Sequence, residues 1–294
     1  MDVYASTDLA CESMPQEEEG RLSQKTREER IGNFRIIEMR LDAEDEKICK
    51  KPRGSYTTVE CGRIHLLSDA DREMLTHLLS GRLRGMSHNL TKKGIDRNFV
   101  VFVAGLGNAA VTADAIGPQA VALLEATRHL REYEKELYES LDCSALCAFA
   151  PGVLGETGIE TLELLRGAVS HVRPDLVVVI DALAARSCER LAATVQISDA
   201  GIVPGSGVGN HRMEISQKTL GVPVVSVGVP TVVNSATLVY DALHQAGVEE
   251  IPQALESVLQ GGKSFFVSPK ESDVITKSVS HLIAGAISMA FTGL

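Results

Sequence analysis

Aromatic residues and basic charge are both in short supply in this chain of 294 residues. Tryptophan is absent and aromatic residues make up only 4% of the sequence, so the core must be packed with aliphatic side chains. Proteins that bind single-stranded nucleic acid stack its bases on aromatic side chains, so this low aromatic content disfavours that function. Lysine and arginine number 29 against 39 aspartates and glutamates, and the net charge of −10 disfavours binding to a phosphate backbone. We therefore expect no nucleic-acid partner.

Signals for export or membrane insertion are also missing. The residues after Met1 form neither the basic nor the apolar region of a secretory signal. The longest apolar run, around 176–185, is interrupted by Asp181 and is too short to span a bilayer. The six cysteines include one close pair, Cys143 and Cys147, without the second pair that is typical of a zinc site. We expect a cytoplasmic protein with reduced thiols, no metal, no cofactor and no membrane contact.

Acidic charge is concentrated at the N-terminus. Residues 1–20 contain six acids and no lysine or arginine, so they carry −6 of the net charge of −10. Residues 1–30 also show no apolar periodicity, which is typical of a flexible or loosely docked segment. We expect this segment to precede one domain over 31–294, with its core at about 98–294.

The rest of the chain alternates between strand and helix patterns. Strands are predicted at 34–41, 56–60, 99–104, 146–150, 176–180, 193–197 and 222–227. Helices are predicted at 66–85, 115–133, 158–172, 233–246 and 269–290. This order is typical of an α/β fold with a largely parallel central sheet. The strands before residue 61 would form a small β and irregular extension on its N-terminal side.

A glycine turn follows the buried strand at 99–104. Residues 105–110 read G-x-G-x-x-A, which on paper is a dinucleotide-binding fingerprint. The helix does not start at once, however, and no acid stands at a strand end about 20 residues on to bind a ribose. Two other interpretations stay open: the glycines only allow a tight exit from the strand, or the loop presents Asp114. Asp114 could also serve simply as a cap for the following helix.

A second carboxylate strengthens a catalytic interpretation of Asp114. Asp181 follows a fully apolar strand, at the edge where open α/β sheets build their sites. If that strand neighbours the one before Asp114, about 4.8 Å away in the sheet, the two carboxylates can share one crevice. Two acids in a poorly solvated crevice do not both ionise easily, so one keeps its proton. Such a pair can activate water with one carboxylate and protonate a carbonyl with the other.

Five blocks of sequence, in this order, resemble the germination protease family, the endopeptidases of spore-forming bacteria that degrade small acid-soluble spore proteins. The blocks read GLGNAAVTADAIGPQAV (105–121), PGVLGETGIET (151–161), VVVIDALAARS (177–187), TVQISDAGIVPGSGVGNHRMEIS (194–216) and VVSVGVPTVV (224–233). The resemblance implies a three-layer α/β/α sandwich, related in fold to the hydrogenase maturation endopeptidases. It also implies that Asp114 and Asp181 are the catalytic pair of an atypical aspartic peptidase.

The same resemblance raises alternatives for the site. In hydrogenase maturation endopeptidases the matching carboxylates bind nickel together with a histidine, and His211 is the nearest candidate here. A nickel-dependent endopeptidase is therefore a second hypothesis, a dinucleotide-binding protein a third and an inactive scaffold a fourth. Cys188, which follows Asp181 closely, is a further candidate nucleophile, although no histidine pairs with it in the sequence.

Members of the resembled family are made as zymogens that lose a short N-terminal piece, and they cut substrates in segments of the type Thr-Glu, then Ile or Phe, then Ala. Residues 7–10 read Thr-Asp-Leu-Ala, so we expect a propeptide-like segment with autocleavage between Asp8 and Leu9. An acid before the cut needs a cationic pocket, for which Arg186 is the first candidate. Other candidates are Arg128, His129 and Arg212. The resemblance further implies small acid-soluble spore proteins as substrate, a homotetramer, and a location in the forespore or spore core.

Overall fold

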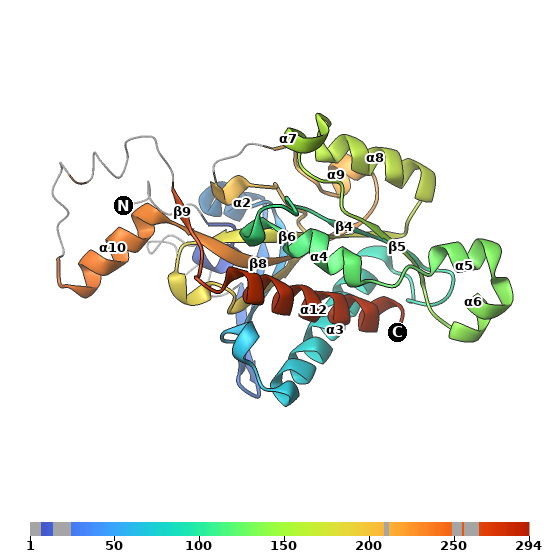
Figure 1. Ribbon diagram of the computed structural model, residues 1–294, viewed down its shortest axis with the longest axis horizontal. Coiled ribbons are helices and arrows are strands. Elements are labelled where there is room, and N and C mark those ends of the chain that lie inside the picture. Colours follow the sequence, from blue (N-terminus) through green and yellow to red (C-terminus); the bar gives the residue numbers. More distant parts are fainter. Residues whose placement is uncertain (1–6, 14–24, 209–211, 249–254, 256–264, 294) are drawn as a thin grey trace.

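The computed structural model describes residues 7–13, 25–208, 212–248, 255 and 265–293. A mixed sheet runs through it in the order β1-β2-β3-β7-β8-β6-β4-β5, with the short β9 beside β8 (Figure 1). The strands are β1 (Thr26–Ile31), β2 (Phe34–Leu41), β3 (Gly54–Glu60), β4 (Val100–Gly105), β5 (Ala145–Phe149), β6 (Leu176–Ala185), β7 (Thr194–Ser198), β8 (Val224–Asn234) and β9 (Phe266–Val267).

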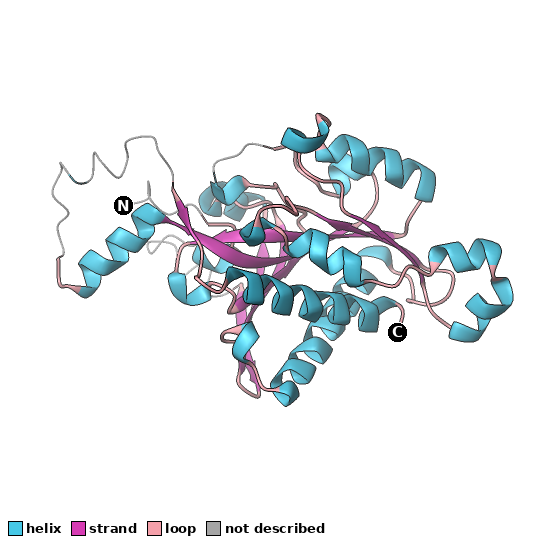
Figure 2. Cartoon of the chain, viewed as in Figure 1, coloured by secondary structure: helices cyan, strands magenta, loops and turns pink. Residues whose placement is uncertain are grey.

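Helices lie on both faces of this sheet, as Figure 2 shows. They are α2 (Ala43–Cys49), α3 (Asp69–Thr91), α4 (Ile116–Leu123), α5 (Arg128–Tyr133), α6 (Lys135–Leu141), α7 (Leu154–Thr157), α8 (Thr161–Val172), α9 (Gln217–Leu220), α10 (Ser235–Gln245) and α12 (Ser272–Phe291). Short 3-10 turns include η1 (Ala10–Glu12), η4 (Thr112–Asp114), η5 (Cys188–Arg190) and η6 (Ser206–Val208). The expected α/β sandwich is confirmed.

The sheet has a parallel half and an antiparallel half, so it is mixed rather than largely parallel. The pairings β5–β4, β4–β6 and β6–β8 are parallel. From β8 outward, β7, β3, β2 and β1 each run antiparallel to their neighbour. The N-terminal strands therefore join the main sheet through β7 instead of forming a separate extension. The catalytic interpretation depends on the parallel half, because strands of that half carry the candidate carboxylates.

Side-chain alternation along β6 builds two apolar cores, one on each face of the sheet. Val178 and Ile180 join a core that includes residues of α3, α4 and α12. Val177 and Val179 join a second core with residues of α8 and α9. Strands covered on both faces read as continuous apolar runs, which is why β6 was predictable from the sequence. Asp181 lies inside this apolar strand, where burying a carboxyl group costs free energy and contributes nothing to apolar packing.

Within the N-terminal 30 residues, the described stretches 7–13 and 25–30 are more ordered than their composition indicates. Residues 26–30, which the sequence placed in a flexible segment, belong to β1 on the edge of the sheet. The strand reads TREERI, and this charge on an edge strand hides the alternation by which strands are predicted. Residues 7–13 also pack onto the sheet, with Leu9 and Ala10 fully buried.

The helix expected at 115–133 is divided in the structure. It forms α4 and α5 instead, because the backbone N–H of Thr127 donates to Leu146 in β5 at 2.9 Å and its hydroxyl donates to Ser144 at 2.6 Å.

The C-terminal α12 is long and apolar enough to cross a membrane by length and composition. Its apolar residues instead form part of the core beside α3 and α4, which gives this composition a structural explanation.

Candidate active site

The glycine turn after β4 lets three stretches of backbone approach closely. A Cβ atom at Gly105 would lie 2.2 Å from the carbonyl oxygen of Gly117 in α4. Gly107 has φ +111°, and a Cβ there would lie 1.9 Å from the carbonyl oxygen of Asp114. The space that these glycines leave is thus filled by α4 and by the turn that carries Asp114. This favours the interpretation in which the loop presents Asp114 over the dinucleotide-binding fingerprint.

Three hydrogen bonds hold the turn that carries Asp114. The Thr231 hydroxyl in β8 donates to the carbonyl of Ala113 at 2.6 Å, and the Thr276 hydroxyl in α12 donates to the carbonyl of Thr112 at 2.9 Å. The Asp114 carboxylate itself accepts the backbone N–H of Asn108 at 2.7 Å. The turn is therefore fixed to the sheet, to a core helix and to the glycine loop. A carboxylate placed in this way has a defined direction before any substrate arrives.

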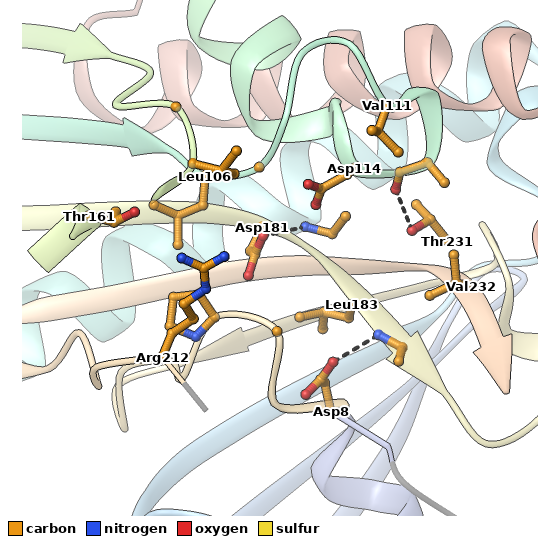
Figure 3. Close-up of a pocket in the computed structure, with 18 of the residues that line it drawn as sticks. Asp8, Leu106, Val111, Asp114, Thr161, Asp181, Leu183, Arg212, Thr231 and Val232 are labelled. Carbon is orange, nitrogen blue, oxygen red and sulfur yellow. Dashed lines mark hydrogen bonds between the residues drawn. The ribbon is translucent and has the colours of Figure 1, made fainter. Parts of the chain in front are cut away.

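Asp181 lies on the strand next to β4, so the condition that the sequence analysis set for a shared crevice is met. β4 and β6 are paired and parallel, with Gly105 opposite Ile180, and the N–H of Leu106 donates to Ile180 at 2.8 Å. Because β6 continues to Ala185 alongside β8, Asp181 lies within the strand rather than at its end. Since β4 stops at Gly105, Asp181 still faces the open edge. Figure 3 shows Asp114 and Asp181 on the wall of one cavity of about 300 Å³.

The two carboxylates have different electrostatic surroundings. Asp181 is only 4% exposed. Burial raises its pKa well above the usual value, the charges of Asp114 and Asp8 raise it further, and its bond from the Ala182 N–H opposes them only partly. Burial also raises the pKa of Asp114, but the Asn108 N–H and the Arg212 guanidinium stabilise its anion. The pKa of Asp181 is therefore the more strongly raised of the two, which favours Asp181 over Asp114 as the site of a proton shared by the pair.

Of the predicted cationic candidates, Arg212 lines the cavity. Arg186 follows β6 with its side chain exposed and lies outside the lining, while its backbone N–H donates to Glu12. Arg128 pairs with Glu132 at 3.2 Å, and His129 is exposed. The structure thus brings Arg212, rather than Arg186, next to the paired carboxylates.

The metal and thiol alternatives receive little geometric support. His211 lies outside the described residues, so its position relative to the paired carboxylates stays a prediction. Among the residues whose placement is described, no three His, Cys, Asp or Glu side chains gather in a way that could hold a metal ion. Cys188 begins η5 and packs against the cluster of Leu9, Leu183, Ala185 and Val233, and it is not among the residues that line the cavity.

The segment expected to contain the self-cleavage site lies at the rim of the same cavity. Asp8 is one of the lining residues, and its carboxylate accepts the N–H of Ala184 in β6 at 2.8 Å. Figure 3 shows Leu183 between Asp8 and Asp181. Ala184 is three residues after Asp181 on one strand, so β6 holds both the predicted cleavage site and Asp181.

The α/β sandwich places a buried and a half-buried carboxylate on one cavity beside its parallel strands, an arrangement typical of enzyme sites. Comparison with known proteins shows that the chain is a peptidase. The sequence profile of the germination proteases matches residues 4–246. A germination protease of Clostridium acetobutylicum is 38% identical over 97% of this chain and 94% of that protein. That of Caldanaerobacter subterraneus subsp. tengcongensis is also 38% identical, over 97% and 93%. The chain belongs to the germination protease family.

Sequence reasoning missed the residues that support the carboxylates and the N-terminal segment. Thr231 looks like any strand threonine. Ser206 and Gly207 lie in a glycine-rich loop whose sequence suits a close approach of substrate backbone and a mobile surface turn equally well. No motif in the sequence distinguishes Arg190 from other arginines. The binding groups at Ala184, Arg186 and Ser187 are backbone N–H groups, which any residue type supplies. Only the fold shows that these groups point at one segment.

Proposed function

We propose that this chain is the endopeptidase that begins the degradation of small acid-soluble spore proteins during spore germination. The observation that carries the proposal is the pair Asp114 and Asp181 on one cavity, with the pKa values of both carboxyls raised by burial. The family membership supports the activity, and the paired acids support a mechanism in which water is activated without a covalent intermediate.

The surroundings of the two acids support a different role for each. Asp114, as the anion that Asn108 and Arg212 stabilise, takes a proton from a water molecule as that water attacks the peptide carbonyl carbon. Asp181, as the neutral acid, donates its proton to the carbonyl oxygen. When the tetrahedral intermediate collapses, Asp114 returns its proton to the leaving amine. The carbonyl proton then goes back to Asp181, which restores the starting state.

Cleavage of a small acid-soluble spore protein by four forms of the chain tests this mechanism. We expect wild type to cut the substrate, and Asp114→Asn and Asp181→Asn each to lose at least about 1,000-fold in kcat/KM, as a removed general acid or base typically does. Asp175→Asn is the matched control, because Asp175 precedes β6 at its other end and holds Lys93 and the Val100 N–H. Full activity in either cavity variant would remove that residue from the mechanism.

We also propose that the chain is a zymogen that cuts itself between Asp8 and Leu9. The support is the position of Asp8 on the wall of the cavity that holds the carboxylate pair. In the described state Leu183 stands between Asp8 and Asp181, so the segment has to shift along β6 before it is cut. Incubation under mildly acid conditions followed by N-terminal sequencing is the test. A mature chain that begins anywhere but Leu9 would contradict the assigned site.

The remaining parts of the proposal concern assembly and location. We propose a homotetramer in the cytoplasm of the forespore and later in the spore core, where the substrate is found. Sedimentation equilibrium of the purified chain tests the assembly, and a particle of one or two chains would rule out the tetramer. Fractionation of sporulating cells tests the location.

A further inference from the structure

One cation lines the cavity of the paired carboxylates. Among the described residues of the lining, Asp8, Asp114, Glu160 and Asp181 are acids, and Arg212 is the single arginine, lysine or histidine. Figure 3 shows the Arg212 side chain pointing into the cavity, toward Asp181. The cavity therefore combines an excess of acidic groups with one guanidinium group.

The acids of the cavity accept hydrogen bonds from groups other than Arg212. These bonds run to Asp8 from the Ala184 N–H and the Ser206 hydroxyl, to Asp114 from the Asn108 N–H, and to Asp181 from the Ala182 N–H. Within the described part of the chain, no residue forms a hydrogen bond or an ion pair with the Arg212 side chain. Arg190 is half-buried as Arg212 is, but it pairs with Glu12 at 3.1 Å and with Glu60 at 2.7 Å. Arg212 is thus a half-buried cation to which none of the described acids is bound.

Arg212 acts on Asp114 through space. Burial raises the pKa of Asp114, whereas the Asn108 N–H and the charge of Arg212 lower it. No hydrogen bond joins the Arg212 and Asp114 side chains, although both line one cavity of about 300 Å³, so part of the open volume lies between them. Ligand pockets in proteins start at about this size. The end of a peptide chain can therefore enter between the guanidinium and the carboxylates.

Hydrolysis of a peptide bond creates a new carboxyl group in this volume. The oxygen of the attacking water joins the carbonyl carbon, the C–N bond breaks, and a proton passes to the leaving amine. In the proposed mechanism Asp114 activates that water, so the new carboxyl group forms beside Asp114. A peptide carboxyl group has a pKa of about 3.5 and is ionised at neutral pH. Its negative charge, next to Asp114 and Asp181, would be repelled if no cation faced it.

We propose that Arg212 binds the α-carboxylate at the new C-terminus of the cleaved peptide, through the two parallel N–H groups with which a guanidinium pairs with a carboxylate. This inference rests on the proposed function. The site takes the main-chain carboxylate that cleavage creates, not a side chain of the substrate, so it acts only after the peptide bond has been cut. A product held in this way keeps the next substrate out of the cavity. The enzyme is therefore inhibited by its own products.

Four short peptides test this site. Two end in Ser-Thr-Asp, as residues 6–8 do, and two end in Ser-Thr-Asn. Each sequence is made with a free carboxylate and with an amide at its C-terminus, so the main-chain and side-chain acids vary separately. Each peptide is measured as an inhibitor of spore protein cleavage and, by fluorescence anisotropy, as a ligand of the full chain. We expect wild type to bind both free acids at least about tenfold more tightly than the matching amides, as a hydrogen bond to a charged group typically gives.

Two arginine variants show whether Arg212 is the group responsible. In Arg212→Gln the preference for the free acid should fall to about twofold or less. Arg186→Gln is the matched control, because Arg186 follows Asp181 by five residues but has an exposed side chain outside the cavity lining. This control should keep the full preference. If Arg212→Gln fails to fold, the ratio of acid to amide affinity in wild type still tests the site.

The outcomes separate this inference from the proposed function. Equal affinity of wild type for the acids and the amides would overturn the product site, even if the spore protein is cut. So would a preference that follows the Asp side chain instead of the C-terminus, or one that is undiminished in Arg212→Gln. Failure to cut the spore protein while wild type still prefers the free acids would instead overturn the proposed activity and leave the carboxylate site in place.

Discussion

The hydroxyl of Thr231 in β8 donates to the carbonyl of Ala113, 2.6 Å away in the turn before α4. This bond joins the strand on one side of β6 to the turn that arrives from the strand on its other side, and so bridges the cavity above Asp181. It fixes the distance between the two walls on which the carboxylates lie. We therefore assign Thr231 as a positioning residue for Asp114.

Replacing Thr231 with valine keeps the shape of the side chain and removes this bond. We expect Thr231→Val to lower kcat about tenfold with little change in KM, because Asp114 loses its direction while the rest of the cavity wall is untouched. Thr127→Val is the control outside the cavity, since Thr127 is buried, donates to a carbonyl at the same 2.6 Å and also accepts the Leu146 N–H at 2.9 Å. Thr231→Val should lose about 1 kcal/mol of stability and Thr127→Val about 2 kcal/mol. An equal loss of kcat in both would show that Thr231 has only a structural role.

The buried Asp181 should reduce the stability of the folded chain at neutral pH. Its pKa is raised on folding, so the folded chain keeps a proton that the unfolded chain releases above about pH 4. The free energy of unfolding therefore falls as the pH rises from about 4 towards the raised pKa. We expect Asp181→Asn to melt at a higher temperature than wild type at pH 7, by roughly 2–4 °C for each kcal/mol relieved. The difference should shrink as the pH approaches 4.

A second buried aspartate provides the control for this melting experiment. Asp45 is fully buried, but it is paired with Lys25 at 2.7 Å and accepts the Asp42 N–H at 2.9 Å. Asp45→Asn should therefore lose about 1–3 kcal/mol at pH 7. A destabilised Asp181→Asn would show that the Asp181 carboxylate is satisfied in the folded state and would contradict its assignment as the neutral acid.

The rate of cleavage should depend on pH in a bell shape. Activity falls on the acid side as Asp114 takes up a proton, and on the alkaline side as the pair loses the proton that Asp181 holds. The Arg212 charge lowers the pKa of Asp114, so Arg212→Gln should move the acid limb to higher pH and leave the alkaline limb where it is. The check is kcat/KM for cleavage of a small acid-soluble spore protein between pH 3 and 9. An unmoved acid limb would exclude Asp114 as the group that titrates there.

Gly207→Ala should release the N-terminal segment from its place beside β6. The added methyl group would lie 2.3 Å from the Asp8 carboxylate and 2.7 Å from the Ala184 Cβ atom, so Asp8 cannot keep its place. Hydrogen exchange at the Leu9 and Ala10 amides should become at least about tenfold faster. Gly167→Ala is the control, because the Cβ at Gly167 meets nothing within 4 Å, and alanine there should stabilise α8 slightly. Unchanged exchange in Gly207→Ala would mean that the Asp8 site adapts to the methyl group.

Much of the parallel half of the fold was predictable because its signals are local. The apolar run of β6 and the stripe Leu162, Leu165 and Val169 of α8 are patterns that neighbouring residues create, and the structure confirms both elements. The order of strands and helices then placed Asp114 and Asp181 at one edge of the sheet. The edge strand β1 was missed because its charged residues hide the alternation of apolar and polar side chains. The antiparallel pairing of β3 with β7 was missed because pairing between segments far apart in the sequence leaves no local pattern.

The sequence by itself determined the α/β class, the acidic N-terminus and the two candidate carboxylates. Each of these depends only on residue type and on patterns within short stretches of the chain. Only the tertiary structure decided which of the two carboxyls has the more strongly raised pKa, since burial and the charges of Asp8, Asp114 and Arg212 are set by segments far apart in sequence. It also decided where residues 7–13 lie. The groups that bind Asp8 and Glu12 include backbone N–H groups of β6 and the loop after it, and a backbone donor has no signature in the amino-acid sequence.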